Sequence, residues 1–166
     1  MANGPRYKVP FRRRREGRTD YRQRARLLRG RVPRAVVRNT LRHTSVQFID
    51  YDAKGDRVLA TAHSKELLEM GWVGSTGNLP AAYLTGYLAG KRAAKKGVNE
   101  AVLDIGLQKP VKGAACFATL SGLLDAGLEI PHGDEILPSE DRLKGKHIKA
   151  EMEKMIEEVK NRMEAD

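Results

Sequence analysis

Short runs of alternating and β-branched hydrophobic residues follow one another after residue 33. Three such runs, RAVVRNT from Arg34, TSVQFIDY from Thr44 and RVLATAH from Arg57, have the two-residue period of half-buried strands. The residues between the second and third runs, DAKG from Asp52 to Gly55, are typical of a tight turn. The pattern therefore predicts a three-stranded antiparallel meander.

The hydrophobic period then changes to that of helices. Ser64 is a potential N-cap for a short helix, KELLEM, that stops at Gly71. After a glycine-rich loop, Asn78 is expected to cap a longer helix that runs to about Lys96. This order of elements predicts an α/β domain in which helices cover a mixed sheet. The remaining predicted elements are a buried strand over 101–107 and a helix over 113–126.

Two spacings predict how helices are packed. Gly86 and Gly90 are four residues apart, which predicts that the helix bearing them approaches the sheet closely. Apolar residues also recur at helical spacing near the C-terminus, and they predict an amphipathic helix whose apolar side packs on the core or on a partner. These C-terminal residues are Ile148, Met152, Met155, Ile156, Val159 and Met163.

Composition limits the class of protein. The chain has 166 residues, of which 40% are hydrophobic, and this suits one domain with a core. The single cysteine, Cys116, excludes an intramolecular disulfide and fits a reducing compartment. The longest stretch without a charge, Met70–Gly90, contains five glycines and a proline, so no membrane helix is expected. With no apolar segment behind the N-terminal charges, we expect a cytoplasmic protein.

Positive charge is concentrated at one end of the chain. Met1–Arg42 contains 15 Lys and Arg residues against two acids, a net charge of +13. His43–Asp166 contains 16 basic and 19 acidic residues, a net charge of −3. A basic arm on a nearly neutral body is typical of a protein that binds a polyanion. A solvated tail or a localisation signal is the alternative.

The arm interleaves aromatic residues with arginines, which favours RNA over a simple signal. Phe11 precedes Arg12–Arg15, and Tyr7 and Tyr21 lie on either side of that run, so side chains that stack on bases alternate with phosphate donors. Two prolines predict an extended backbone over Gly4–Phe11.

A helix is expected in the second half of the arm. Asp20 has the properties of an N-cap and Gly30 those of a C-terminal stop, which predicts a helix over Tyr21–Arg29. Arg22, Arg26 and Arg29 would share one face of it, with Tyr21, Ala25 and Leu28 on the neighbouring stripe.

Other chemistry receives little support. The loop Gly74–Asn78 could cradle a backbone phosphate or be a structural turn, and it lacks a Walker lysine. The four histidines have no metal-binding spacing, so neither a metal nor a cofactor is expected. A magnesium nuclease built on Asp50, Asp52 and Asp104 is the enzymatic alternative, but the first two aspartates flank a turn, where local hydrogen bonding accounts for them.

Four ordered blocks resemble one protein family. They are RYKVPFRRRREGRTDYRQRARLL from Arg6, GNLPAAYLTGYLAG from Gly77, AVLDIGLQKP from Ala101 and GLEIPH from Gly127. Together they resemble the archaeal and eukaryotic branch of the L-eighteen family of large-subunit ribosomal proteins. The resemblance implies a three-layer α/β fold with a ribonuclease-H-like motif and without enzymatic activity, an extended basic arm and a C-terminal helix.

The same resemblance implies partners and contacts. Members bind 5S ribosomal RNA and attach it to the large-subunit rRNA in the central protuberance, beside neighbouring ribosomal proteins and without a membrane or a small-molecule substrate. We expect an RNA-binding arm over 1–33, a body over 34–132 and a C-terminal extension over 133–166. The expected RNA-binding residues are Arg6, Lys8, Phe11, Arg12, Arg13, Arg14, Arg15, Arg18, Tyr21, Arg22, Arg26 and Arg29 in the arm, and Arg38, Gln47 and Trp72 in the body.

Overall fold

A mixed four-stranded sheet forms the centre of the computed structural model, which describes residues 4–148 and 152–165. The strand order is β3-β2-β1-β4, with antiparallel pairing from β1 to β3 and parallel pairing of β1 with β4. The meander and the mixed sheet are thereby confirmed. The strands are β1 (Arg34–Asn39), β2 (Thr44–Asp50), β3 (Arg57–His63) and β4 (Val102–Asp104).

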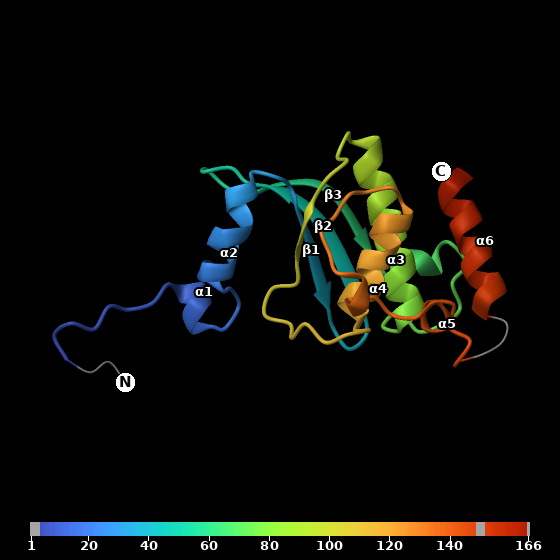
Figure 1. Cartoon of the computed structure of the whole chain (residues 1–166), viewed down its shortest axis with the longest axis horizontal. Coiled ribbons are helices and arrows are strands. Elements are labelled where there is room, and N and C mark those ends of the chain that lie inside the picture. The colour runs from blue at the N-terminus through green and yellow to red at the C-terminus, as the bar shows by residue number, and fades with distance from the viewer. Residues whose placement is uncertain (1–3, 149–151, 166) are drawn as a thin grey trace.

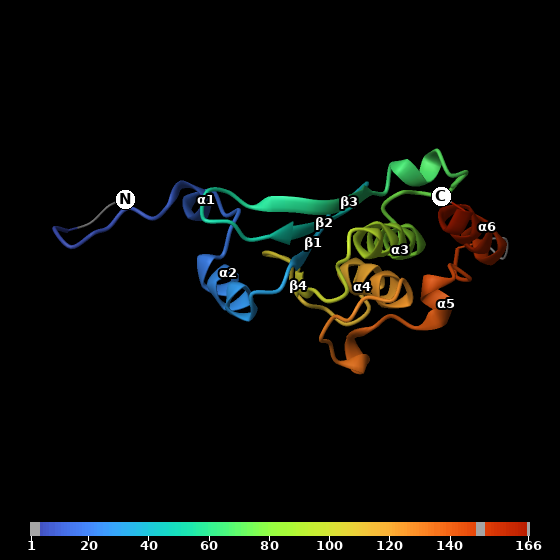
Figure 2. The ribbon, with the colours of Figure 1, turned by 90° about the horizontal axis from the view of Figure 1, so that it is seen from above.

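Two helices cover one face of the sheet. They are α3 (Leu79–Lys95) and α4 (Ala115–Asp125), which lie side by side in Figure 2. As predicted, the Asn78 side chain accepts a hydrogen bond from the Ala81 N–H at 2.9 Å and caps α3. Ala35, Val37 and Phe48 are fully buried in the core against these helices. The α/β class is thus confirmed.

The glycines of α3 pack on α4 rather than on the sheet. A Cβ at Gly86 would clash with the Thr119 carbonyl oxygen, and one at Gly90 would lie 2.5 Å from the Ala126 Cβ. Gly122 makes the reciprocal close approach to the Tyr83 carbonyl oxygen. The spacing of Gly86 and Gly90 therefore correctly predicted that their helix closely approaches a neighbouring element. That element is α4 and not the sheet.

The C-terminal segment packs on the outer side of this helix pair. It contains α5 (Glu140–Leu143) and α6 (Met152–Ala165), which lie beyond α3 and α4 in Figure 1. Met152, Ile156, Val159 and Met163 are buried, whereas Ile148 is 43% exposed and lies outside the helix. The apolar stripe of α6 is therefore part of the core of this chain.

Two tyrosines of α3 add polar contacts to α6 and α4. The Tyr87 hydroxyl donates to Glu164 at 2.5 Å, and the Tyr83 hydroxyl donates to Asp125 at 2.5 Å. The Lys160 ammonium lies 4.7 Å from the ring centre of Tyr83 and 4.8 Å from that of Tyr87. Burial, reinforced by the hydrogen bond to Glu164, raises the pKa of Tyr87 to about 12. These contacts fix α6 against α3.

Two predicted elements differ in detail. The segment after Ser64 forms only a 3-10 turn, Glu66–Leu68, and the Ser64 hydroxyl accepts from the Thr44 N–H at 3.0 Å instead of capping it. The strand expected over 101–107 ends at Asp104, because the chain turns at Gly106, which has φ of +65°. None of the helices in the described part of the chain has the length and apolar content that crossing a membrane requires.

β3 is an edge strand whose pairing with β2 is irregular. The register with β2 shifts between Phe48 and Ile49. On the outer side of β3, an Arg92 N–H donates to the Thr61 carbonyl oxygen at 2.8 Å. The same guanidinium contacts Glu66 at 2.6 Å. A side chain of α3 thus occupies part of the free edge of the sheet.

Candidate nucleic-acid interface

The N-terminal arm lies on the side of the sheet away from α3 and α4, and its segment from Gly4 to Phe11 extends beyond the body (Figure 1). The arginine run forms a short helix, α1 (Arg12–Arg15), directly after the stretch expected to be extended. Before it, the Tyr7 N–H donates to the Gly4 carbonyl oxygen at 3.2 Å, so the expected extended stretch begins with a turn. All four arginines of α1 are exposed.

Few arginines of α1 have acidic partners. Arg12 lies 3.6 Å from Glu16, and Arg18, just after α1, lies 3.2 Å from the same carboxylate. Arg13 donates to the Thr19 hydroxyl at 2.9 Å. Arg14 and Arg15 make no ion pair with any residue that the structure describes. The arm therefore presents uncompensated guanidinium groups to solvent.

The second arm helix, α2 (Tyr21–Leu27), begins as predicted and ends differently. The Asp20 carboxylate accepts from the N–H groups of Arg22 and Gln23, and these hydrogen bonds, that from Gln23 above all, hold its pKa below the usual value. A 3-10 turn over Leu28–Gly30 follows, and the left-handed residue is Arg31, with φ of 54°, rather than Gly30. The chain therefore changes direction one residue later than expected.

The three arginines predicted to share one face of this segment, Arg22, Arg26 and Arg29, are exposed. Of the neighbouring stripe, Tyr21 and Leu28 are half-buried, but Ala25 is exposed. The Phe11 and Tyr21 rings lie 5.2 Å apart and are tilted by 56°, which ties the start of α1 to the start of α2. Phe11 is still 71% exposed, so its ring is accessible to a base.

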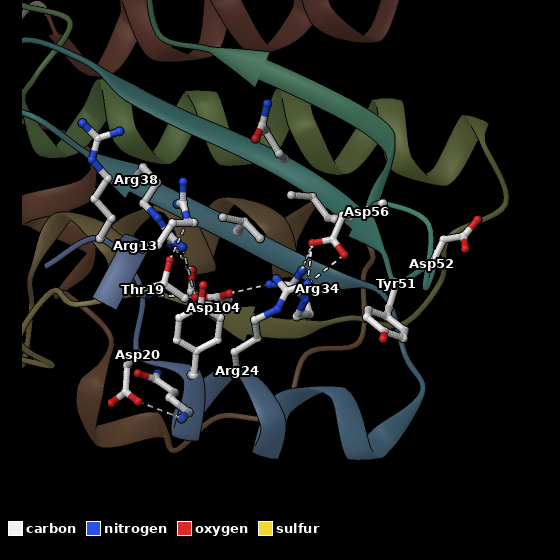
Figure 3. Close-up of a pocket in the computed structure, with 18 of the residues that line it drawn as sticks. Arg13, Thr19, Asp20, Arg24, Arg34, Arg38, Tyr51, Asp52, Asp56 and Asp104 are labelled. Carbon is white, nitrogen blue, oxygen red and sulfur yellow. Dashed lines mark hydrogen bonds and ion pairs between the residues drawn. The ribbon is translucent and has the colours of Figure 1, made fainter. Parts of the chain in front are cut away.

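A chain of ion pairs joins the arm to the sheet (Figure 3). Arg24 of α2 contacts both oxygens of Asp56, at 2.8 and 2.9 Å. Asp56 also accepts from Arg34 at 2.8 Å, and Arg34 contacts Asp104 at 2.8 Å. Asp104 is bound in turn by Arg38 at 3.3 Å. The sequence did not single out Arg24, Asp56 or Arg34, because arginines are common throughout its first 42 residues and an aspartate beside a turn is common as well.

The aspartates considered for a nuclease have other structural roles. Asp104 is 6% exposed and is paired with two arginines, which neutralise its charge. Asp50 accepts from the Tyr51 N–H and Asp52 from the Lys54 N–H, as expected of residues at a turn. Among the described residues, no group of three or more His, Cys, Asp or Glu side chains could hold a metal ion.

A cleft of about 650 Å³ separates the arm from the open face of the sheet. Arg13, Arg18 and Tyr21 line it from the arm, and Arg38 and Gln47 line it from the sheet. Arg38 lies on β1 and Gln47 on β2, where the two strands are directly paired through Val36 and Gln47. The structure therefore brings two body residues chosen from the sequence to the same cleft as residues of the arm.

Trp72 does not belong to this surface. It is 2% exposed, and its indole N–H donates to the Ser75 carbonyl oxygen at 3.2 Å. The loop after it is structural as well: Thr76 donates to the Arg42 carbonyl oxygen at 2.6 Å, and a Cβ at Gly77 would lie 2.6 Å from the Leu41 carbonyl oxygen. Because Trp72 has no ring face available for a base, we remove it from the RNA-binding residues.

Comparison with known proteins identifies the family. The model of a family described as "Ribosomal large subunit proteins 60S L5, and 50S L18" matches residues 5–101 and 94–133. The chain belongs to this family. It is 54% identical over 158 residues to large ribosomal subunit protein uL18 of Methanothermobacter thermautotrophicus, covering 95% of this chain and 82% of that protein. It is 56% identical over 159 residues to uL18 of Methanococcus maripaludis, covering 96% and 82%.

Membership of this family of large-subunit ribosomal proteins makes the chain a structural, non-enzymatic component of the large ribosomal subunit, and hence a cytoplasmic protein. It also confirms the expected branch of the L-eighteen family, the archaeal and eukaryotic one, through these two archaeal relatives.

Proposed function

We propose that this uL18 relative binds 5S rRNA and mediates its attachment to the large-subunit rRNA in the central protuberance. The observation that carries the proposal is the arrangement of arginines on α1 and α2, most of them without an ion pair among the described residues, beside a cleft lined by Arg38 and Gln47. Family membership supports an RNA partner within the large subunit.

We assign the initial capture of RNA to the arm. Each guanidinium that binds a phosphate releases condensed counterions, and this gives an affinity that depends on salt but not on sequence. The phosphate-binding residues of the arm would be Arg6, Lys8, Arg12, Arg13, Arg14, Arg15, Arg18, Arg22, Arg26 and Arg29.

Recognition of RNA shape would come from aromatic stacking and from the cleft. Phe11 is exposed, and Tyr21 lies at the edge of the cleft, so both rings can stack on unpaired bases. Gln47 is exposed on the open sheet face, and its amide can both donate to and accept from a base edge. Arg38, 44% exposed in its side chain, adds a planar cation next to it.

In this proposal, residues 1–33 contact RNA, residues 34–132 orient the arm and provide the cleft, and residues 133–166 pack on the body beside neighbouring ribosomal proteins. The experiment is a salt titration of binding to 5S rRNA and to a length-matched DNA duplex. The intact chain is compared with a truncated chain that begins at Arg34.

If the arm neutralises about six to ten phosphates, the affinity of the intact chain for 5S rRNA falls by about 10³ to 10⁵ between 50 and 200 mM salt. We expect selectivity for RNA in the intact chain and weak, unselective binding in the truncated one. Equal affinity for RNA and DNA would contradict the proposal and favour a general polyanion binder. A nearly flat salt dependence would contradict the proposed mechanism.

A further inference from the structure

We propose that Asp56 is a positioning residue for RNA binding: its carboxylate strengthens binding by holding the basic arm in a fixed direction. This inference rests on the proposed function. It concerns an acidic residue that lines the same cleft as Arg13, Arg18 and Arg38, where simple charge repulsion would make it unfavourable for an RNA ligand.

Asp56 joins the arm to the body through contacts with two arginines. On one side, both carboxylate oxygens accept from the Arg24 guanidinium of α2, at 2.8 and 2.9 Å. On the other side, one oxygen accepts from Arg34 at 2.8 Å. Arg34 is 3% exposed and is itself bound to Asp104, so the body end of the bridge is buried and fixed.

No other polar contact performs the same task in the part of the chain that the structure describes. Between residues 4–31 and the remaining described residues, Arg24–Asp56 is the only hydrogen-bonded or ionic contact. The chain then reverses at Arg31 in a left-handed conformation. A segment with a single polar contact to the body is held weakly, and one charge-assisted ion pair, in which one guanidinium nitrogen contacts both carboxylate oxygens, is therefore able to select the direction of α2.

The affinity for RNA depends on the fraction of free molecules in which the arm already points in the direction that binding requires. RNA must contact the arm and the open sheet face together, so only arm directions that align both surfaces are competent to bind. When the competent fraction falls, the apparent affinity falls by the same factor. Asp56 raises this fraction in the free protein, although its own charge repels phosphate.

The matched control is Asp52, which lies in the same turn and lines the same cleft. Its carboxylate accepts only a local hydrogen bond, from the Lys54 N–H at 3.0 Å. Asp52→Asn and Asp56→Asn each remove one negative charge from this region. Charge repulsion alone predicts equal or tighter RNA binding for both variants. A positioning role predicts weaker RNA binding for Asp56→Asn only.

The experiment measures binding of the full chain and these variants to 5S rRNA at several salt concentrations. We expect Asp52→Asn to bind as tightly as the wild type or slightly more tightly. We expect Asp56→Asn to bind about three- to tenfold more weakly with an unchanged salt slope, because the competent fraction changes while the number of phosphate contacts does not. Asp56→Glu, which keeps the charge, should restore part of the loss.

A second readout follows the arm directly. In the free protein, ¹⁵N relaxation should show greater motion of the α2 amides in Asp56→Asn than in Asp52→Asn, while the β1–β3 amides stay rigid in both. Equal RNA affinity and equal α2 mobility in the two variants would overturn the positioning role and leave the proposed function intact. Failure of the wild type to prefer RNA over duplex DNA would instead refute the proposed function.

Discussion

Arginines in the arm and arginines in the body have different roles, and the difference depends on nearby carboxylates. In the arm, Arg14 and Arg15 are exposed and have no ion pair among the described residues. In the body, Arg34 and Arg38 both bind Asp104, and Arg92 binds Glu66. Arg34 and Arg92 therefore hold elements together, and Arg38 does so while 44% of its side chain stays exposed to the cleft, whereas most arm arginines remain available for an external anion. Whether a carboxylate lies beside an arginine therefore indicates better than the number of arginines in a segment whether that arginine is available to bind RNA.

The largest expected effect tests the arm alone. Replacing Arg12–Arg15 with alanine keeps a good helix former in α1 but removes four cations. We expect the affinity for 5S rRNA to fall by about 10³-fold at 100 mM salt and the log–log salt slope to become shallower by about three. The thermal transition should stay almost unchanged, because α1 buries no residue.

A control with the same change in charge separates the arm from net charge. Alanine at four exposed lysines outside the arm, Lys95, Lys96, Lys109 and Lys154, also removes four cations. This control should lose far less RNA affinity. Equal losses in the two variants would mean that the whole surface, and not the arm, attracts RNA.

The next effect tests the body arginines. Asp104→Ala leaves Arg38 without its carboxylate and Arg34 with only Asp56. Removing one partner of a buried ion pair costs about 3 kcal/mol, so the free energy of unfolding in urea should fall by that amount. Asp52→Ala, which removes an exposed carboxylate, is the control. A change of less than about 0.5 kcal/mol for Asp104→Ala would contradict the structural role of this network.

A smaller effect tests the packing of α3 on α4. Gly86→Ala places a Cβ against the Thr119 carbonyl oxygen, and we expect it to destabilise the body by about 2 kcal/mol. Gly133→Ala has open space around its Cβ and no unusual φ, so chemical denaturation should detect little change. If both substitutions are neutral, the two helices adjust more easily than their contact suggests.

The smallest effect compares the helix caps of the two regions. Asp20 caps α2 with a carboxylate whose pKa lies below its ordinary value of 3.8, whereas Asn78 caps α3 with an amide that does not titrate. The contribution of the ionised Asp20 carboxylate to the stability of α2 is therefore present above pH 3.8. It is lost as the pH falls through the lowered pKa of Asp20. NMR amide shifts should show α2 loosening before α3 on acidification.

Asp20→Asn removes this pH dependence while keeping a side-chain oxygen that can cap the helix. In that variant the α2 amides should respond to acid no earlier than those of α3. Simultaneous loss of α2 and α3 in the wild type would contradict the role given to the Asp20 carboxylate.

Sequence patterns predicted the elements that local chemistry decides. The meander, the Asp20 and Asn78 caps and the buried stripe of α6 each depend on spacing within one segment, and all are present. The Arg24–Asp56 pair was not predictable in the same way, since 32 residues separate its members and their contact depends on the direction of the arm. Trp72 was expected only from the family resemblance, which says nothing of its burial; in the structure it is 2% exposed and the loop at Gly74 packs against its ring.

The edge strand β3 has a consequence for the protein before it meets its RNA. An unprotected strand edge can pair with the same edge of another copy, and a ribosomal protein is synthesised apart from the particle that it joins. The register shift opposite Phe48 and Ile49 and the Arg92 hydrogen bond to Thr61 make such pairing less favourable. These two features make edge-to-edge pairing of two free chains through β3 less favourable before assembly.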